Sequence, residues 1–330
     1  MEGAGGREQA RPAGIGPAKL LFVARPAQGP SPVRGWTPKR RFGGSNRRQP
    51  VWYLDENWNG SEPETPSMKA ARTVAELRQA IAHARGDGGP IGLVPTMGAF
   101  HDGHLALMRR ARAECAAVVV SVFVNPIQFG ESEDLASYPI DLARDTALAR
   151  EVGADILFTP SLEEMYPVGF ATSVQVAGLS ETLCGAPGRR GQEHFSGVAT
   201  VVTKLLNMCQ PDIAYFGAKD YQQVLVVKRL VQDLDIPVRV EVCETVRDED
   251  GLALSSRNAY LSELERRRAL SLNRALDAAR AAIADGVNSA NEVRTAAMRE
   301  LDAPGVEPEY VESCRHGISA SSTRSPAKTC

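Results

Sequence analysis

The sequence VPTMGAFHDGH, residues 94–104, separates a short apolar run from a segment with helical spacing. The run Ile91–Met97 is bounded by glycine and proline on one side and by Gly98 on the other, which is typical of a short buried strand. Leu105–Ala113 then carries apolar residues at helical spacing. A glycine-containing turn lets a ligand approach the backbone, and the following helix presents free N–H groups to an anion. We therefore predict a strand–turn–helix unit that binds phosphate.

Strand and helix patterns alternate on both sides of this unit. The strands are near-continuous apolar runs and helices of similar or greater length separate them, which predicts a parallel sheet covered on both faces. The predicted fold class is therefore α/β, a doubly wound parallel sheet whose ligands bind beyond the carboxyl ends of the strands. The predicted helices are Lys69–Ala84, Leu105–Ala113, Leu142–Val152, Ser196–Met208 and Tyr221–Leu234, and the strands are Ile91–Met97, Ala117–Val124, Asp155–Thr159, Ile213–Phe216 and Val238–Val242.

The two ends of the chain differ from this alternating part. Residues 1–67 are rich in Gly, Pro and Arg, so we expect disorder or a non-native extension, with a transit peptide as the alternative. Residues 68–257 are expected to form the sheet domain. Residues 258–312 are expected to form a smaller, mainly helical domain, whose long helix begins at a capping box in Ser262–Glu265. Residues 313–330 read as a divergent polar tail.

Composition excludes several classes of protein. The formal net charge of the 330 residues is −2, although residues 1–50 carry ten Lys and Arg against two acidic residues. A net charge this close to zero gives the chain as a whole no strong electrostatic attraction to nucleic acid. No apolar run is long enough to span a membrane. The six cysteines form no C-x-x-C pair, which favours reduced thiols in the cytoplasm over disulfides or zinc.

Three polar loops follow three of the predicted strands. In the first, His101 and His104 lie three residues apart and can converge on one phosphate; a metal site would need a third ligand, and none stands at a usual spacing. In the second, Lys219 can reach a phosphate, while Asp220 can bind a ribose hydroxyl or cap the next helix. The third, Leu254–Asn258, places two hydroxyls beside a guanidinium. Ordinary turns with surface side chains are the alternative for each loop.

A fourth polar set follows the strand Ala117–Val124. Asn125–Phe129, with Tyr138 downstream, offers amide groups that could bind the hydroxyl and carboxylate of a small polar substrate, or could simply form an Asx turn. His194, at the entry to a long helix, is a further candidate, with a structural histidine as the alternative.

These segments resemble the pantoate–β-alanine ligase (pantothenate synthetase) family. The matching motifs are VPTMGAFHDGH, VSVFVNPIQFG, EDLASYP, HFSGVATVVTKLLN, FGAKDYQQ and DGLALSSRNAYLS, in the family's order over roughly residues 69–312. The resemblance implies a Rossmann-like, nucleotidyltransferase-type fold and a homodimer. It also implies a Mg²⁺-dependent reaction in which ATP activates pantoate as an enzyme-bound adenylate, and β-alanine then displaces AMP to give pantothenate.

The resemblance also assigns roles to individual residues, and none is expected to bind a metal. The residues expected to act in catalysis are His101, His104, Lys219, Ser255, Ser256 and Arg257. Those expected to bind ATP are Pro95, Thr96, Met97, Gly98, Gly217, Asp220, Val246 and Leu254. Those expected to bind pantoate are Asn125, Gln128, Gln223, Tyr138 and His194.

The chain departs from the family pattern at a few positions. Ala218 stands where the family has Glu, Leu254 where it has Met, and Ile140-Asp141 where it has Arg-Thr. After Tyr310–Glu312 the family's C-terminal strands are not recognisable, so we expect a truncated second domain that closes poorly over the site. Two alternatives follow: an impaired homologue that binds nucleotide or dimerises without efficient turnover, and a nucleotidyltransferase with a different acceptor.

Overall fold

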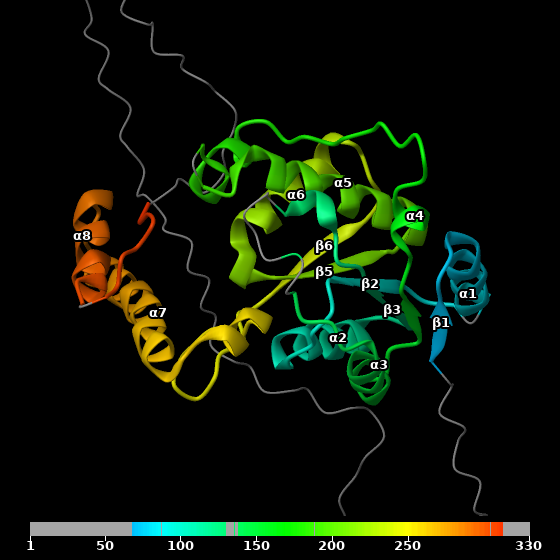
Figure 1. The fold of residues 1–330 in the computed structure, drawn as a ribbon, viewed down its shortest axis with the longest axis horizontal. Coiled ribbons are helices and arrows are strands. Elements are labelled where there is room, and N and C mark those ends of the chain that lie inside the picture. Colours follow the sequence, from blue (N-terminus) through cyan, green and yellow to red (C-terminus); the bar gives the residue numbers. More distant parts are fainter. Residues whose placement is uncertain are drawn as a thin grey trace, which may run out of the picture. The chain divides into compact units, whose positions relative to one another are not determined.

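A six-stranded parallel sheet organises the part of the chain that the computed structural model describes, which is residues 68–312 without 87, 130–134, 136–137, 188 and 304 (Figure 1). The strand order is β1-β4-β3-β2-β5-β6, and every pairing is parallel. The strands are β1 (Lys69–Ala71), β2 (Ile91–Thr96), β3 (Ala117–Val122), β4 (Ile156–Phe158), β5 (Ile213–Gly217) and β6 (Arg239–Cys243). The predicted doubly wound α/β fold is confirmed.

Helices cover both faces of this sheet and create two separate apolar layers. One layer packs under α1 (Val74–Gly86), α5 (Gly191–Cys209) and α6 (Tyr221–Asp233). The other packs under α2 (Asp102–Glu114) and α3 (Leu142–Glu151). Figure 1 shows α5 and α6 on one side of the strands and α2 and α3 on the other. Strand β3 lies between the layers, which explains why its valines form an unbroken apolar run.

The connections create a switch point beside β2. From β2 the chain moves to β3 and then β4 on one side, and it returns through α5 to β5, which pairs with the other side of β2. The helices that follow β2 and β5 therefore leave toward opposite faces of the sheet. A crevice opens between the carboxyl ends of two such strands, and ligands of this fold class bind there.

The structure corrects the prediction of a helix over Lys69–Ala84. Residues Lys69–Ala71 form the edge strand β1, paired with β4, and α1 begins only at Val74. The pairing buries Ala71, and the Glu76 carboxylate accepts the backbone N–H groups of Arg72 and Thr73 at the start of α1. The sequence Lys-Ala-Ala has no preference for a strand, so tertiary pairing overrode the local helical propensity.

Two further helices follow the sheet. They are α7 (Glu263–Ala284) and α8 (Ala290–Leu301), which pack together through buried Ala275, Ala279 and Val293. The predicted capping box is confirmed, because Ser262 accepts from the Glu265 N–H while the Glu265 carboxylate accepts from the Ser262 N–H.

The remaining elements are short. They are α4 (Leu162–Met165) and the 3-10 turns η1 (Pro126–Gln128), η3 (Leu179–Glu181), η4 (Leu183–Gly185), η5 (Ala218–Asp220) and η6 (Ser256–Tyr260). The predictions for residues 1–67 and 313–330 lie outside the described residues, and the domain boundaries stay predictions. Among the described helices, none combines the length and the apolar character needed to cross a membrane.

Candidate active site

The turn after β2 is held in a strained shape by one buried carboxylate. Gly98 and Ala99 have φ angles of +89° and +53°, in the left-handed region. Asp145 of α3 receives the Ala99 N–H at 2.8 Å and the Phe100 N–H at 2.7 Å, one on each carboxylate oxygen. Burial raises the pKa of Asp145, while these two backbone bonds lower it. Asp145 therefore fixes the path of the predicted phosphate loop as it enters α2.

His101 and His104 cap the helix that follows. The Nδ1 atom of His101 accepts the Gly103 N–H at 3.1 Å, and the Nδ1 atom of His104 accepts the His101 N–H at 3.4 Å, which makes a capping box built from histidines. A neutral imidazole whose Nδ1 accepts a hydrogen bond carries its proton on Nε2. Both rings, with centroids 4.1 Å apart, thus keep Nε2–H as their donor.

Electrostatics keeps this histidine pair neutral. Burial, the neighbouring His101 and the Lys219 ammonium lower the pKa of His104 to about 3. Burial and Lys219 also lower the pKa of His101. The two imidazoles are therefore neutral hydrogen-bond donors at pH 7, and Lys219 supplies the positive charge beside them.

The second predicted loop follows β5, the strand next to β2. Gly217 ends β5, and Ala218–Asp220 form the turn η5 directly before α6. Lys219 lies close enough to both histidines to depress their pKa values, and its Nζ is 3.7 Å from the Asp220 carboxylate. Asp220 holds the N-cap position of α6 but makes no side-chain cap bond, so the capping interpretation is not supported. Gln223 lies in the first turn of α6.

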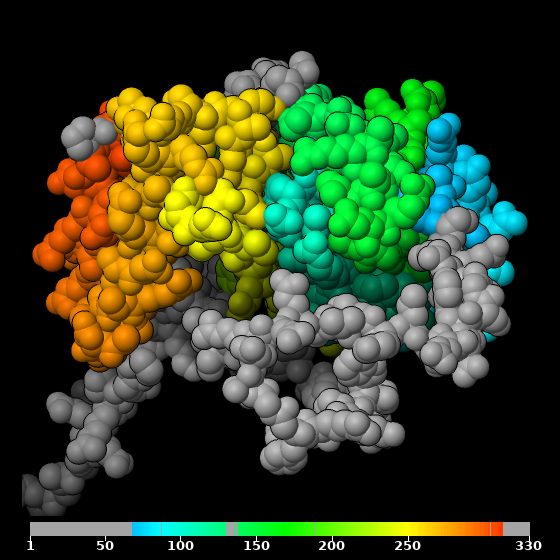
Figure 2. Space-filling model, turned by 90° about the horizontal axis from the view of Figure 1, so that it is seen from below, coloured from blue at the N-terminus to red at the C-terminus, as the bar shows by residue number. Residues whose placement is uncertain are grey.

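The third loop meets the start of α2. Leu254 donates its N–H to the Val246 carbonyl at 3.0 Å, and a Cβ at Gly103 would lie 3.8 Å from the Leu254 Cβ. Ser255 caps the turn η6 by accepting the Arg257 N–H at 3.3 Å. Figure 2 shows the yellow surface of this part of the chain beside the teal surface of α2. The histidine and serine loops are thus neighbours, as predicted.

Tyr138 joins the third loop to the segment after β3. Its hydroxyl lies 3.3 Å from the Ser256 Oγ, and the Arg257 guanidinium carbon lies 5.9 Å from its ring centroid. Tyr138 is buried and packs edge-on against Phe129.

The amide set after β3 is bonded largely within the protein. Asn125 is 1% exposed, and its amide contacts Tyr166, Gly197 and Gln128. The Nε2 atom of Gln128 lies 2.9 Å from the Met97 Sδ, which places Gln128 beside the first loop. The Nδ1 atom of His194 lies 2.6 Å from the Gln128 carbonyl oxygen, so His194 fixes the backbone of Gln128.

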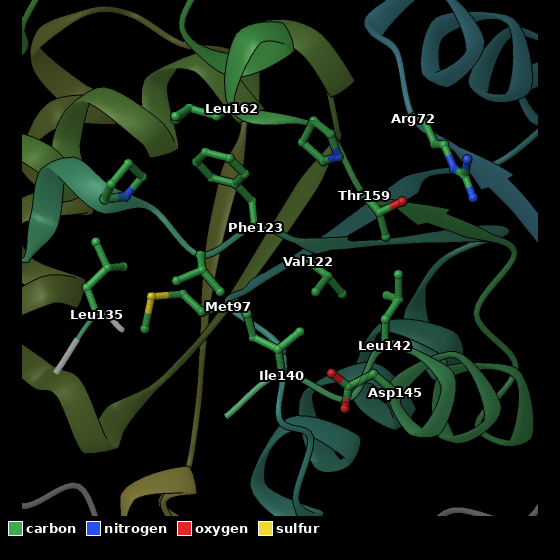
Figure 3. Close-up of a pocket in the computed structure, with 14 residues that line it drawn as sticks. Arg72, Met97, Val122, Phe123, Leu135, Ile140, Leu142, Asp145, Thr159 and Leu162 are labelled. Carbon is green, nitrogen blue, oxygen red and sulfur yellow. The ribbon is translucent and has the colours of Figure 1, made fainter. Parts of the chain in front are cut away.

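A pocket with a volume of about 540 Å³ lies at the carboxyl ends of β2 and β3 (Figure 3). Met97 and Gly98 of the predicted ATP set line it, together with Val122, Ile140 and Asp145. None of the five residues predicted to bind pantoate lines it. Ile140, where the family has Arg, is 70% exposed and sits at this pocket, so the departure lies next to the phosphate loop.

Sequence reasoning missed Asp145 and Tyr166. Each contributes through hydrogen bonds to residues far away in the chain, two for Asp145 and one for Tyr166, and neither stands in a motif typical of a site. A buried carboxylate at the start of a helix looks like an N-terminal charge, and Tyr166 looks like a core aromatic. Only the fold brings Asp145 to Ala99 and Tyr166 to Asn125.

Comparison with known proteins identifies the family of this chain. The family pantoate-beta-alanine ligase matches residues 69–328. The chain is 54% identical over 245 residues to pantothenate synthetase of Moorella thermoacetica, which covers 74% of this chain and 86% of that protein. It is 48% identical over 268 residues to pantothenate synthetase 1 of Bradyrhizobium diazoefficiens, covering 80% and 93%.

Two solved structures are also similar. A crystal structure of pantothenate synthetase from Thermus thermophilus has a TM-score of 0.66 at 54% identity and covers 71% of this chain and 82% of that one. Pantoate-beta-alanine ligase from Francisella tularensis, complexed with beta-gamma ATP and β-alanine, has a TM-score of 0.59 at 34% identity, with 71% and 87% covered. None of these matches supports the impaired-homologue alternative. With three loops meeting at the switch point and relatives of this identity, the chain belongs to the pantoate–β-alanine ligase family.

Proposed function

We propose that this protein condenses (R)-pantoate with β-alanine, using ATP, to give pantothenate, AMP and pyrophosphate. The observation that carries the proposal is the meeting of the histidine loop, Lys219 and the serine loop at the carboxyl ends of β2 and β5. The Francisella tularensis relative is described with an ATP form and β-alanine bound, which supports the same pair of ligands here.

The first step is the transfer of adenylate to pantoate. A pantoate carboxylate oxygen attacks the α-phosphorus of ATP, a new P–O bond forms, and the bond to pyrophosphate breaks. Charge on the phosphates must be neutralised while the reactants stay in line, and this requires fixed donors more than covalent chemistry. The Nε2–H groups of His101 and His104 and the Lys219 ammonium supply such donors. Ser255, Ser256 and Arg257 would add contacts to the phosphates from the third loop.

The second step transfers the acyl group. The neutral amine of β-alanine attacks the carbonyl carbon of pantoyl adenylate, the C–O bond to AMP breaks, and the amine loses a proton to solvent. Gln128 and Gln223 would hold the pantoyl part during both steps, while Gly217, Asp220 and Val246 would contact the nucleoside. The same phosphate donors stabilise AMP as it leaves.

Magnesium, dimerisation and compartment are part of the proposal. Among the described residues, no three His, Cys, Asp or Glu side chains form a group that could hold a metal ion. Mg²⁺ commonly binds substrate phosphates with few protein ligands, so the ion would arrive with ATP. We expect a homodimer in the cytoplasm, which sedimentation of the purified protein and fractionation of the source cells would test.

Exchange of labelled pyrophosphate into ATP tests the proposed function directly. The exchange should depend on pantoate and should proceed without β-alanine, because it reports only the first step. Pantothenate should form when β-alanine is added. A folded protein that gives no pantoate-dependent exchange would refute the proposal. Exchange with another small acid in place of pantoate would instead indicate a different acceptor.

A further inference from the structure

A short chain of hydrogen bonds links Tyr166 to the candidate pantoate site. The Tyr166 hydroxyl donates to Asn125 Oδ1 at 2.8 Å. The Asn125 Nδ2 donates to the Gly197 carbonyl at 3.1 Å and to Gln128 Oε1 at 3.2 Å. The chain ends at Gln128 Nε2, which lies 2.9 Å from the Met97 Sδ. Each member is half-buried or buried, so these bonds face little competition from water.

The Gly197 carbonyl sets the direction of every bond in this chain. A backbone carbonyl only accepts hydrogen bonds, so the Asn125 nitrogen must face it and the Asn125 oxygen must face Tyr166. The tyrosine hydroxyl must then donate, and burial raises its pKa to about 12, which keeps its proton in place. The second proton of the Asn125 amide leaves Gln128 only one orientation, with its oxygen toward Asn125.

The backbone around Gln128 is fixed by two independent contacts. A Cβ at Gly197 would lie 2.7 Å from both the Gln128 nitrogen and the Ile127 carbonyl oxygen, so α5 approaches the turn η1 as closely as glycine permits. His194, one turn earlier in α5, contacts the Gln128 carbonyl. The orientation of the Gln128 side chain is therefore decided by the hydrogen bonds of Asn125 and not by backbone freedom.

We propose that Tyr166 is a positioning residue for pantoate, which acts through Asn125 to make Gln128 present its amide nitrogen, a hydrogen-bond donor, to an oxygen of the substrate. The proposal rests on the proposed function and changes the predicted role of Asn125 from substrate contact to support. In this proposal Tyr166 does not contact the reacting atoms and acts only through Asn125. Its ring packs on Phe123 and Phe170, and a phenylalanine would keep these ring contacts.

The test compares Tyr166→Phe with the matched control Tyr215→Phe. Tyr215 is also a buried tyrosine with a bonded hydroxyl, but its partners are Glu114 and Cys115 at the far end of α2. Loss of the Tyr166 hydroxyl leaves the buried Asn125 Oδ1 without its donor, so the amide of Asn125 is held only by its bonds to Gly197 and Gln128 and can shift away from the geometry that orients Gln128. The KM for pantoate should rise about threefold to tenfold, while the KM for ATP and kcat stay within about twofold. The control should leave all three constants within about twofold, even where it lowers the melting temperature.

A second variant tests the polarity of the chain without relying on Tyr166. Asn125→Asp keeps the shape but cannot donate to Gly197 or to Gln128, so the KM for pantoate should rise further than in Tyr166→Phe. An unchanged pantoate KM in both variants, with an active wild type, would overturn this inference alone. A rise shared equally by ATP would overturn it too, because that indicates general loosening. An inactive wild type would instead refute the proposed function.

Discussion

The neutral state of His104 has a measurable consequence for stability. The pKa of this histidine is about 3 in the folded protein, against 6.5 for an ordinary histidine. Because the folded pKa is lowered, the stabilisation is fully present above pH 6.5 and is lost as the pH falls toward 3. Between pH 7 and pH 5.5 the unfolded chain gains a proton that folded His104 does not bind. This lowers the free energy of unfolding by about 1.2 kcal/mol.

The variant His104→Gln isolates this contribution. Glutamine has no titrating group, and its side-chain oxygen can still accept the His101 N–H in a capping box. Urea denaturation at pH 7 and pH 5.5 measures the free energy of unfolding of both proteins. Between pH 7 and pH 5.5 the free energy of unfolding of the wild type should fall by about 1 kcal/mol more than that of the variant. The protonation of His101 and of the carboxylates contributes equally in both proteins. Parallel losses would refute the assignment of His104 as a buried, neutral histidine.

Three further substitutions test the geometry around the site. Lys219→Met should lower pyrophosphate exchange by about 10²–10³ with little change in melting temperature, and a loss below tenfold would contradict its role at the phosphates. Asp145→Asn places an N–H₂ group against a backbone N–H of the turn, so unfolding should become easier by about 1–3 kcal/mol and the KM for ATP should rise. Gly197→Ala should push α5 away from Gln128 and lower the free energy of unfolding, measured by urea denaturation, by about 1–3 kcal/mol. An unchanged free energy of unfolding would show that the close approach is unimportant.

The central strands and the long helices were predictable because burial sets the spacing of their apolar residues. Strands buried on both faces read as apolar runs, and Val118–Val120 are fully buried as expected. Edge strand β1 was not predictable, since Lys69 and Ala70 are exposed and only pairing with β4 makes them a strand.

The candidate site was predictable where one loop carries the chemistry, and unpredictable where distant residues orient it. His101, His104 and Lys219 stand in short motifs at the ends of strands, and the fold brings them together. The carboxylate of Asp145 reaches its loop across 45 residues, and local sequence gives no sign of such a bond. The hydrogen bonds by which Asp145 holds this loop depend on how α3 packs beside it, and no short sequence motif indicates that packing.

The ring nitrogens of His101 and His104 have different partners: each Nδ1 accepts a backbone N–H at the start of α2, and the proposed function assigns each Nε2–H to the phosphates. If the proposed function holds, selection for folding and selection for catalysis act on the same two positions. A library of random variants sorted only for soluble expression should already be depleted of most substitutions at these residues. The few that survive, such as glutamine at 104, should be side chains that can still accept a backbone N–H.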